Sequence, residues 1–260
     1  GGKDSLVTVE ILRTLPYPMA TFVLGDFPVI EEVAKRTETP LFVVKRRLDP
    51  LLFELNKQGA YNGHVPISAI FSLTAILTAV LQDFSTVVAS QERSASSGNV
   101  VYEGREINHQ YSKSFAFEEA LHNLLKSDVS PALSYFSLLR PLSELHIAKI
   151  FSRLEEYHSR FTSCNRAFHL NGSQISGPGR GLWCGNCPKC RFVFLALAPF
   201  LSKKELLQIF GQNLLAQIDQ LQGFLDILFF QYELKLHLFH PAISCPAGRK
   251  PLQQRRDHIV

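Results

Sequence analysis

Gly1-Gly2-Lys3-Asp4-Ser5 opens the sequence and runs directly into an amphipathic stretch over residues 6–15. Two adjacent glycines let the backbone approach a ligand closely, and the N–H groups of such a turn can point at phosphate oxygens. The dipole of the helix that follows adds positive potential at the same place. The stretch therefore predicts a phosphate-binding turn at the start of a helix.

A glycine-rich phosphate turn normally joins a strand to the N-terminus of a helix, and no residues precede Gly1 here. We therefore expect the chain to come from a longer protein. The first strand, and an N-terminal region that acts as a partner of this chain, are expected outside the sequence.

Short β-type runs alternate with helical stretches after the turn. Residues 20–24, 41–44 and 85–89 are predicted as strands, and residues 29–36 and 66–82 as helices. This alternation predicts an α/β fold with a parallel sheet and helices on both faces, whose ligands bind at the carboxyl ends of the strands. From about residue 115 the pattern turns mainly helical, over residues 117–125, 143–157, 191–201, 203–210 and 213–230.

Composition excludes several classes of protein. The 260 residues are 46% hydrophobic and 19% charged, which is ordinary for a globular protein and unlike a disordered one. A net charge of +4 is too small to indicate a nucleic-acid partner. The apolar run over residues 67–81 is interrupted by serine and threonine, and no leader is evident, so we expect a cytoplasmic protein without a membrane partner.

Three of the five cysteines are crowded together. Cys184, Cys187 and Cys190 follow one another at two-residue intervals, and Cys164 lies upstream across a Gly- and Ser-rich stretch at 171–180. Four thiolates suit a tetrahedral zinc ion, and this spacing lets a short loop curl around the metal. A redox or nucleophilic cysteine and inert buried thiols are the alternatives, and Cys164 is either a zinc ligand or a catalytic group.

The form Gly-Gly-x-Asp-Ser resembles the phosphate turn of the PP-loop ATP pyrophosphatases, which cut ATP between the α- and β-phosphates. The resemblance implies that Gly1, Gly2 and Ser5 bind pyrophosphate and that Lys3 supplies charge to it. Asp4 is then expected near a Mg²⁺ ion that bridges the phosphates. Lys3 and Asp4 are therefore predicted as catalytic residues.

A second resemblance rests on several longer blocks. They are similar to those of the UDP-N-acetylmuramoyl-L-alanyl-L-glutamate epimerase family, called MurL, and comprise residues 62–66, 92–96, 108–114, 135–144, 161–165 and 183–194. The family adenylates the terminal L-glutamate of the UDP-muramoyl dipeptide with ATP and Mg²⁺ and inverts it to D-glutamate for peptidoglycan. The alternatives are another PP-loop enzyme, such as one similar to 7-cyano-7-deazaguanine synthase, or an inactive zinc-stabilised fragment.

The resemblance also implies a division of the chain. Residues 1–160 are expected to form the PP-loop nucleotide-binding α/β domain. Residues 161–240 are expected to carry a zinc loop and C-terminal helices, with a flexible tail over 241–260.

Two blocks supply candidates for catalysis. Glu92 and Arg93 follow a predicted strand and are expected to contact Mg²⁺ and a substrate carboxylate or phosphate, the alternative being a surface ion pair. His109 and Lys113 lie in a polar block, and either is a candidate for the base that moves the α-proton or for a substrate ligand; a structural histidine is the alternative. The two proton-transfer residues stay unassigned.

Two further pairs flank predicted helix starts. Asn62 and His64 are expected either to contact ATP or the sugar nucleotide or to cap the helix that follows. Arg140 and Glu144 are expected either as part of a helix cap or as a clamp on the substrate, with Arg140 also a cofactor-binding candidate.

Overall fold

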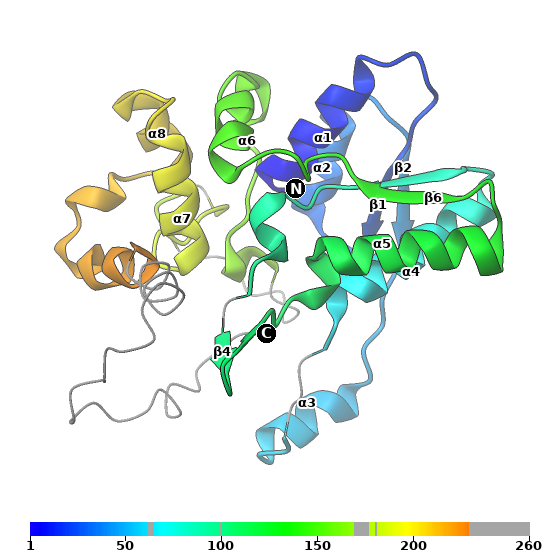
Figure 1. Ribbon diagram of the computed structural model, residues 1–260. Coiled ribbons are helices and arrows are strands. Elements are labelled where there is room, and N and C mark those ends of the chain that lie inside the picture. The colour runs from blue at the N-terminus through cyan, green and yellow to red at the C-terminus, as the bar shows by residue number, and fades with distance from the viewer. Residues whose placement is uncertain (62–64, 99, 169–176, 180, 229–260) are drawn as a thin grey trace.

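The computed structural model describes residues 1–61, 65–98, 100–168, 177–179 and 181–228 (Figure 1). Helix α1 (Lys3–Arg13) begins directly after the two glycines, and Gly2 is its N-cap in extended conformation. The helix therefore begins within the predicted phosphate turn, and Lys3, Asp4 and Ser5 are its first residues. The cap provides no side-chain hydrogen bond, which leaves the first N–H groups of α1 to other partners.

The predicted strands are confirmed to within one residue. β1 (Thr21–Leu24) pairs in parallel with β2 (Leu41–Val44), and α2 (Pro28–Arg36) connects them. β3 (Thr86–Ala89) pairs in parallel with β6 (Ser134–Ser137), which was not predicted as a strand. The predicted long helix is α4 (Ile67–Leu81), and it packs on β3, whereas α5 (Phe115–Leu124) packs on β6.

The described strands pair in parallel as predicted, but the two parallel pairs do not join into a single sheet within the described residues. Their strands form three two-stranded sheets, of which the third is an antiparallel hairpin of β4 (Val100–Tyr102) and β5 (Arg105–Ile107). Paired strands must lie about 4.8 Å apart, and no described strand lies between β1 and β3 to join the two parallel pairs. The first strand expected before the phosphate turn stays a prediction.

The C-terminal part is helical, as predicted. It contains α6 (Glu144–Phe151), α7 (Pro188–Leu197) and α8 (Lys203–Phe210). The long helix predicted over 213–230 is instead two short 3₁₀ turns, η6 (Leu214–Ala216) and η7 (Ile218–Gln220), followed by helix at 221–228. Asn213 caps η6 with its side chain, and this local bond competes with continuous helix.

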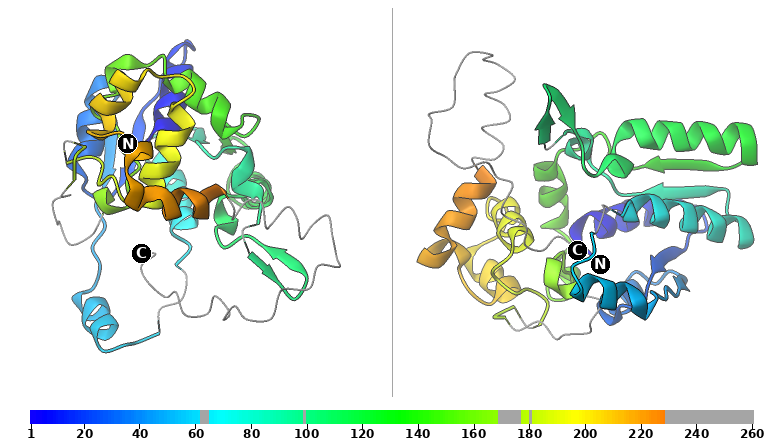
Figure 2. Two further views of the ribbon diagram at one scale, coloured as in Figure 1. Left: turned by 90° about the vertical axis from the view of Figure 1, so that its left-hand side faces the viewer. Right: turned by 90° about the horizontal axis from the view of Figure 1, so that it is seen from below.

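Several short elements complete the described chain. α3 (Pro50–Lys57) and the β4–β5 hairpin project from the rest of the molecule (Figure 2). The remaining short helices are η1 (Arg93–Ser96), η2 (Tyr111–Lys113), the π-helical η3 (Leu125–Val129), η4 (Glu155–Tyr157) and η5 (Asn165–Phe168). None of the helices in the described ranges combines the length and apolar character that a membrane crossing requires.

One hydrophobic core joins the two ends of the chain. Leu6 and Val7 of α1 belong to the same buried cluster as Phe151, Trp183 and Phe210. Helix α1 packs beside α6 (Figure 1), and α6 packs on α7. The phosphate turn is therefore held against the helical C-terminal part and not only against the strands that follow it.

A glycine pair tests the packing at the end of α8. Gly211 has a φ of 76°, and a Cβ there would lie 1.9 Å from the carbonyl oxygen of Pro178. Gly59 has a φ of 83° and nothing within 4 Å of that position. We expect Gly59→Ala to cost about 1 kcal/mol in free energy of unfolding, from backbone strain alone, and Gly211→Ala to cost at least about 3 kcal/mol. Urea unfolding measures both, and equal losses would contradict the packing described here.

Candidate functional site

The predicted phosphate turn is anchored by the segment that carries Cys164. The carbonyl oxygen of Gly1 accepts a hydrogen bond of 3.0 Å from the backbone N–H of Thr162. A Cβ at Gly2 would lie 2.8 Å from the hydroxyl oxygen of Ser163, so the Ser163 side chain closely approaches the turn. Ser5 folds back and donates to the carbonyl of Gly2 at 2.9 Å. Hydrogen bonds to Thr162 and within the turn therefore fix its backbone conformation.

Lys3 is a buried charge with two carboxylate partners. Its side chain is 3% exposed, and its ammonium donates to Asp4 at 2.6 Å and to Glu144 at the N-terminus of α6. Burial opposes this charge, but the two carboxylates outweigh burial and raise the pKa of Lys3 above its ordinary value. Lys3 therefore stays charged and holds α1 against α6.

Glu144 joins the predicted site through Lys3. Burial raises the pKa of Glu144, the charge of Lys3 opposes this shift, and the negative charges of Asp4 and Glu92 add to it. These carboxylates therefore influence one another at the phosphate turn. The sequence had indicated Glu144 only as a helix cap or clamp residue, because nothing local links it to Lys3.

Glu92 is buried at the start of η1. Its carboxylate accepts hydrogen bonds from the N–H and the hydroxyl of Ser94, the latter at 2.8 Å. The next residue is Arg93. Its backbone N–H donates a hydrogen bond to the carbonyl of Leu142, and its guanidinium donates one to the carbonyl of Pro141. Within the described residues, neither Glu92 nor Arg93 forms the surface ion pair that was the alternative.

Arg140 connects the two predicted catalytic blocks. Its guanidinium pairs with the buried carboxylate of Glu118 at 2.7 Å and donates to the carbonyls of Glu92, at 2.9 Å, and Lys113, at 3.0 Å. The hydroxyl of Ser96 accepts a further bond. Because these contacts are internal, Arg140 in this structure fixes the positions of Glu92 and Lys113.

Lys113 ends η2 and is partly buried. Its ammonium donates to the side-chain oxygen of Gln110 at 2.9 Å. Burial lowers the pKa of Lys113, and the charge of Lys189 in the first turn of α7 lowers it further. Lys189 was not singled out from the sequence. His109 lies in the exposed turn just before η2, and Asn62 and His64 lie outside the described residues.

The four predicted cysteines converge. Their sulfur atoms all lie within 4.8 Å of one another and form, within the described ranges, the only group of three or more metal-ligating side chains that could hold an ion. The sulfurs of Cys164 and Cys187 are 3.9 Å apart, those of Cys184 and Cys190 are 3.8 Å apart, and those of Cys187 and Cys190 are 3.5 Å apart. Tetrahedral zinc with bonds of about 2.3 Å requires sulfur separations of about 3.8 Å, so the cluster fits such a metal.

Local structure shapes this cysteine cluster. Cys187 is the N-cap of α7, where its sulfur accepts the N–H of Cys190 at 3.4 Å, and the sulfur of Cys184 accepts the N–H of Asn186. Three aromatic rings belong to the same buried cluster as these cysteines and contact one another in a row. The ring centroids of Phe161 and Trp183 are 5.1 Å apart, and those of Trp183 and Phe210 are 4.8 Å apart. The metal-binding geometry is therefore part of the hydrophobic core.

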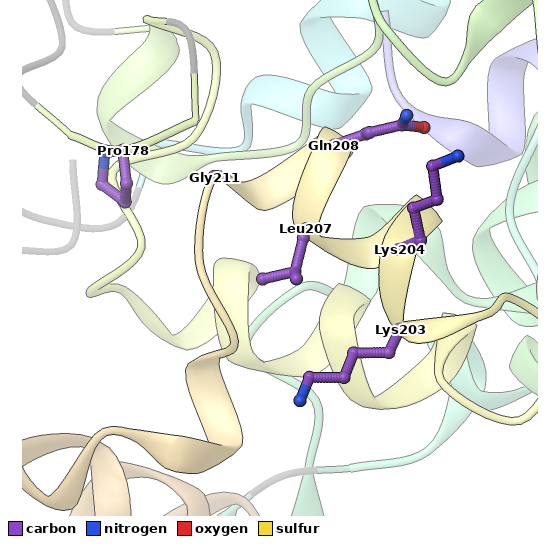
Figure 3. A pocket seen from close by; sticks show the side chains of 6 residues that line it. All are labelled: Pro178, Lys203, Lys204, Leu207, Gln208 and Gly211. Carbon is purple, nitrogen blue, oxygen red and sulfur yellow. The ribbon is translucent and has the colours of Figure 1, made fainter.

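A separate surface hollow of about 610 Å³ lies along α8. Its lining residues are Pro178, Lys203, Lys204, Leu207, Gln208 and Gly211 (Figure 3). The side chains of Lys203 and Lys204 extend in different directions. None of the described residues of the predicted site lines it, so it plays no part in the site above.

The fold and site define a mixed α/β protein with a glycine-rich helix start and a cysteine cluster able to bind a metal. Two family models match the chain, the MurL N-terminal domain over residues 1–138 and the MurL C-terminal domain over residues 160–235. The chain therefore belongs to the MurL family. The resemblance found in the sequence motifs is confirmed.

Curated relatives agree with this assignment. Proteins named UDP-N-acetyl-alpha-D-muramoyl-L-alanyl-L-glutamate epimerase from Xanthomonas oryzae, Salinispora tropica and a Micromonospora species are 47%, 46% and 45% identical to the chain. The alignments cover 88–89% of this chain and 49–50% of those proteins. The chain thus spans about half the length of the curated relatives it matches.

Removal of one thiol tests the cysteine cluster. We expect Cys164→Ser to lose most of a stoichiometric bound metal and roughly 3 kcal/mol or more of the free energy of unfolding, since metal binding contributes directly to folding. Cys245→Ser, at the one cysteine outside the cluster, is the matched control and should keep both. Metal analysis and thermal unfolding measure the effects, and unchanged metal content in Cys164→Ser would refute the four-cysteine site.

The pairing of Arg140 with Glu118 tests the internal role of Arg140. The two side chains are 14% and 9% exposed, so Arg140→Met leaves a buried carboxylate without its partner and should cost about 3 kcal/mol of stability. The exposed pair of Arg160 with Glu32 gives the control, and Arg160→Met should cost less than about 1 kcal/mol. Equal losses in chemical denaturation would contradict the assignment.

Proposed function

We propose that the protein containing this chain is an ATP-dependent epimerase that inverts the terminal L-glutamate of UDP-N-acetyl-α-D-muramoyl-L-alanyl-L-glutamate. The observation that carries this proposal is the identity of 45–47% with relatives named for that epimerisation. Of the resemblances considered from the sequence, this one accounts for both halves of the chain, since the two matched domains include the phosphate turn and the cysteine cluster. The PP-loop class of ATP chemistry, the division at residue 160 and the cytoplasmic location remain predictions from the sequence.

Adenylation explains why an epimerase would need ATP. An α-hydrogen beside an ionised carboxylate is very weakly acidic, because the carbanion would carry two adjacent negative charges. Attack of the glutamate carboxylate on the α-phosphorus of ATP releases pyrophosphate and forms an acyl-adenylate, whose carbonyl accepts the carbanion charge. A base then removes the α-proton, an acid returns one to the opposite face, and attack of water on the acyl carbon releases AMP.

The phosphate turn is the proposed site for pyrophosphate. The glycine backbone and Ser5 stand at the N-terminus of α1, where the helix dipole favours anions. Lys3 contributes positive charge there and also fixes the direction of Asp4 through their 2.6 Å contact. Among the described residues the acidic groups do not form a complete metal cage, which suits Mg²⁺, an ion that protein carboxylates and substrate phosphates hold together. Asp4 and Glu92 are its proposed protein ligands, and the ion would neutralise phosphate charge.

Lys113 is our first choice for the base that removes the α-proton. Because burial lowers its pKa, more of its amine is neutral at a given pH than in an exposed lysine, and only the neutral amine accepts a proton. Nearby His109 is the proposed acid for the opposite face, and Arg93 the proposed contact for a substrate carboxylate. The cysteine cluster is proposed to hold structural zinc, because four thiolates favour that ion.

The first experiment uses the protein in its full natural length. ATP, Mg²⁺ and UDP-N-acetylmuramoyl-L-Ala-L-Glu are supplied, AMP and pyrophosphate are measured, and the released glutamate is resolved by chirality after hydrolysis of the product. We expect AMP release with D-glutamate. Pyrophosphate release without inversion would overturn the proposed substrate chemistry, and no turnover would overturn the enzymatic proposal.

Two substitutions separate the proposed half-reactions. Asp4→Asn should lower substrate-dependent pyrophosphate release at least about 100-fold, because a ligand of Mg²⁺ is lost. Lys113→Met should leave that release largely intact and lower exchange of the α-proton with deuterium in the solvent by about 100-fold or more. Lys35→Met, on the exposed side of α2, is the control and should behave as the wild type. Normal deuterium exchange in Lys113→Met would exclude Lys113 as the base.

A further inference from the structure

A buried threonine connects the phosphate turn with the cysteine cluster. Thr162 is 1% exposed, and its backbone N–H donates to the carbonyl of Gly1 at 3.0 Å. Its hydroxyl donates to the carbonyl of Leu182 at 2.6 Å and accepts the N–H of Cys164 at 3.0 Å. One residue thus bonds to the turn and to both chain segments that bring cysteines into the cluster.

The positions of these bonds decide what Thr162 does. Leu182 lies two residues before Cys184, and Cys164 lies two residues after Thr162. The Thr162 hydroxyl therefore holds together two segments that a metal ion would also hold together through the cysteine sulfurs. The backbone N–H of the same residue bonds to Gly1 of the turn.

The neighbouring residue adds a second contact to the turn. The hydroxyl oxygen of Ser163 lies so close to Gly2 that a Cβ there would approach it to 2.8 Å. Thr162 and Ser163 therefore contact both glycines of the turn. A displacement of the segment that carries Cys164 would move these contacts, and with them the N–H groups of the turn to which the proposed function assigns phosphate binding.

We propose that Thr162 is a positioning residue that couples metal binding in the cysteine cluster to phosphate binding in the Gly1–Ser5 turn. A metal bound to Cys164 and Cys184 fixes the two segments at the separation that the Thr162 hydroxyl spans. The Thr162 N–H then holds the turn in its anion-binding form. The coupling rests on the proposed function, because it takes MgATP as the ligand of the turn.

Thermodynamic linkage gives the coupling a measurable consequence in both directions. If bound metal strengthens the binding of MgATP, then MgATP must strengthen the binding of the metal by the same factor. We expect saturating MgATP to slow the transfer of zinc from the protein to a chromogenic chelator by about fivefold or more, and removal of zinc to weaken MgATP binding by a similar factor. Titration calorimetry measures the second effect on the folded protein.

Three variants identify Thr162 as the connection. Thr162→Val keeps the volume and the backbone N–H but removes the hydroxyl, so it should keep stoichiometric zinc and lose the protection by MgATP. Thr162→Ser restores the hydroxyl and should restore protection. Thr8→Val is the matched control, since the buried Thr8 hydroxyl on α1 has no hydrogen-bond partner within the described residues, and it should retain full protection.

The outcomes separate the two proposals. MgATP that binds to the wild-type protein without slowing zinc transfer overturns the coupling and leaves the proposed function intact, and so does full protection in Thr162→Val. A wild-type protein that does not bind MgATP overturns the proposed function and the coupling with it. If Thr162→Val does not fold, the comparison of zinc transfer in the wild type with and without MgATP still decides whether the two sites are coupled.

Discussion

A lysine ammonium that water scarcely reaches is stable in a protein interior only when carboxylates neutralise it. Lys3 meets this requirement with its neighbour Asp4 and with Glu144 from a distant helix. The ion pair of Lys3 with Glu144 joins the start of α1 to the start of α6, and the two helices pack side by side. The glycines before Lys3 also lie against the segment that carries Cys164, so the phosphate turn and the cysteine cluster are neighbours in the fold.

The sequence predicted those features that depend on residues close to one another along the chain. Short apolar runs located three parallel strands, and the cysteine spacing located the cluster, because strand formation and metal binding both leave a periodic trace in the sequence. The partners of Lys3 and Arg140 leave no such trace, since Glu144 and Glu118 are ordinary carboxylates on distant helices. The separation of the two parallel strand pairs was not predicted, because it depends on which strands pair across the whole fold and not on the pattern within any one strand.

The residues that join the two halves of the molecule lie between the two matched domains. Neither matched domain includes residues 139–159. This interval contains Arg140, which holds the backbone at Glu92 and Lys113, and Glu144, which pairs with Lys3. It also contains Phe151, a fully buried ring of the common core. A connection between domains is thus the part that assembles the site, and the two halves share one core.

The sulfur of Cys187 has two tasks, since it belongs to the cysteine cluster and caps the first turn of α7. Serine and aspartate are the better helix caps, but neither offers the soft thiolate that a tetrahedral four-sulfur site selects. Alanine offers neither property. A substitution of Cys187 therefore changes the start of α7 and the metal-binding geometry of the cluster together, so that neither can be altered there independently of the other.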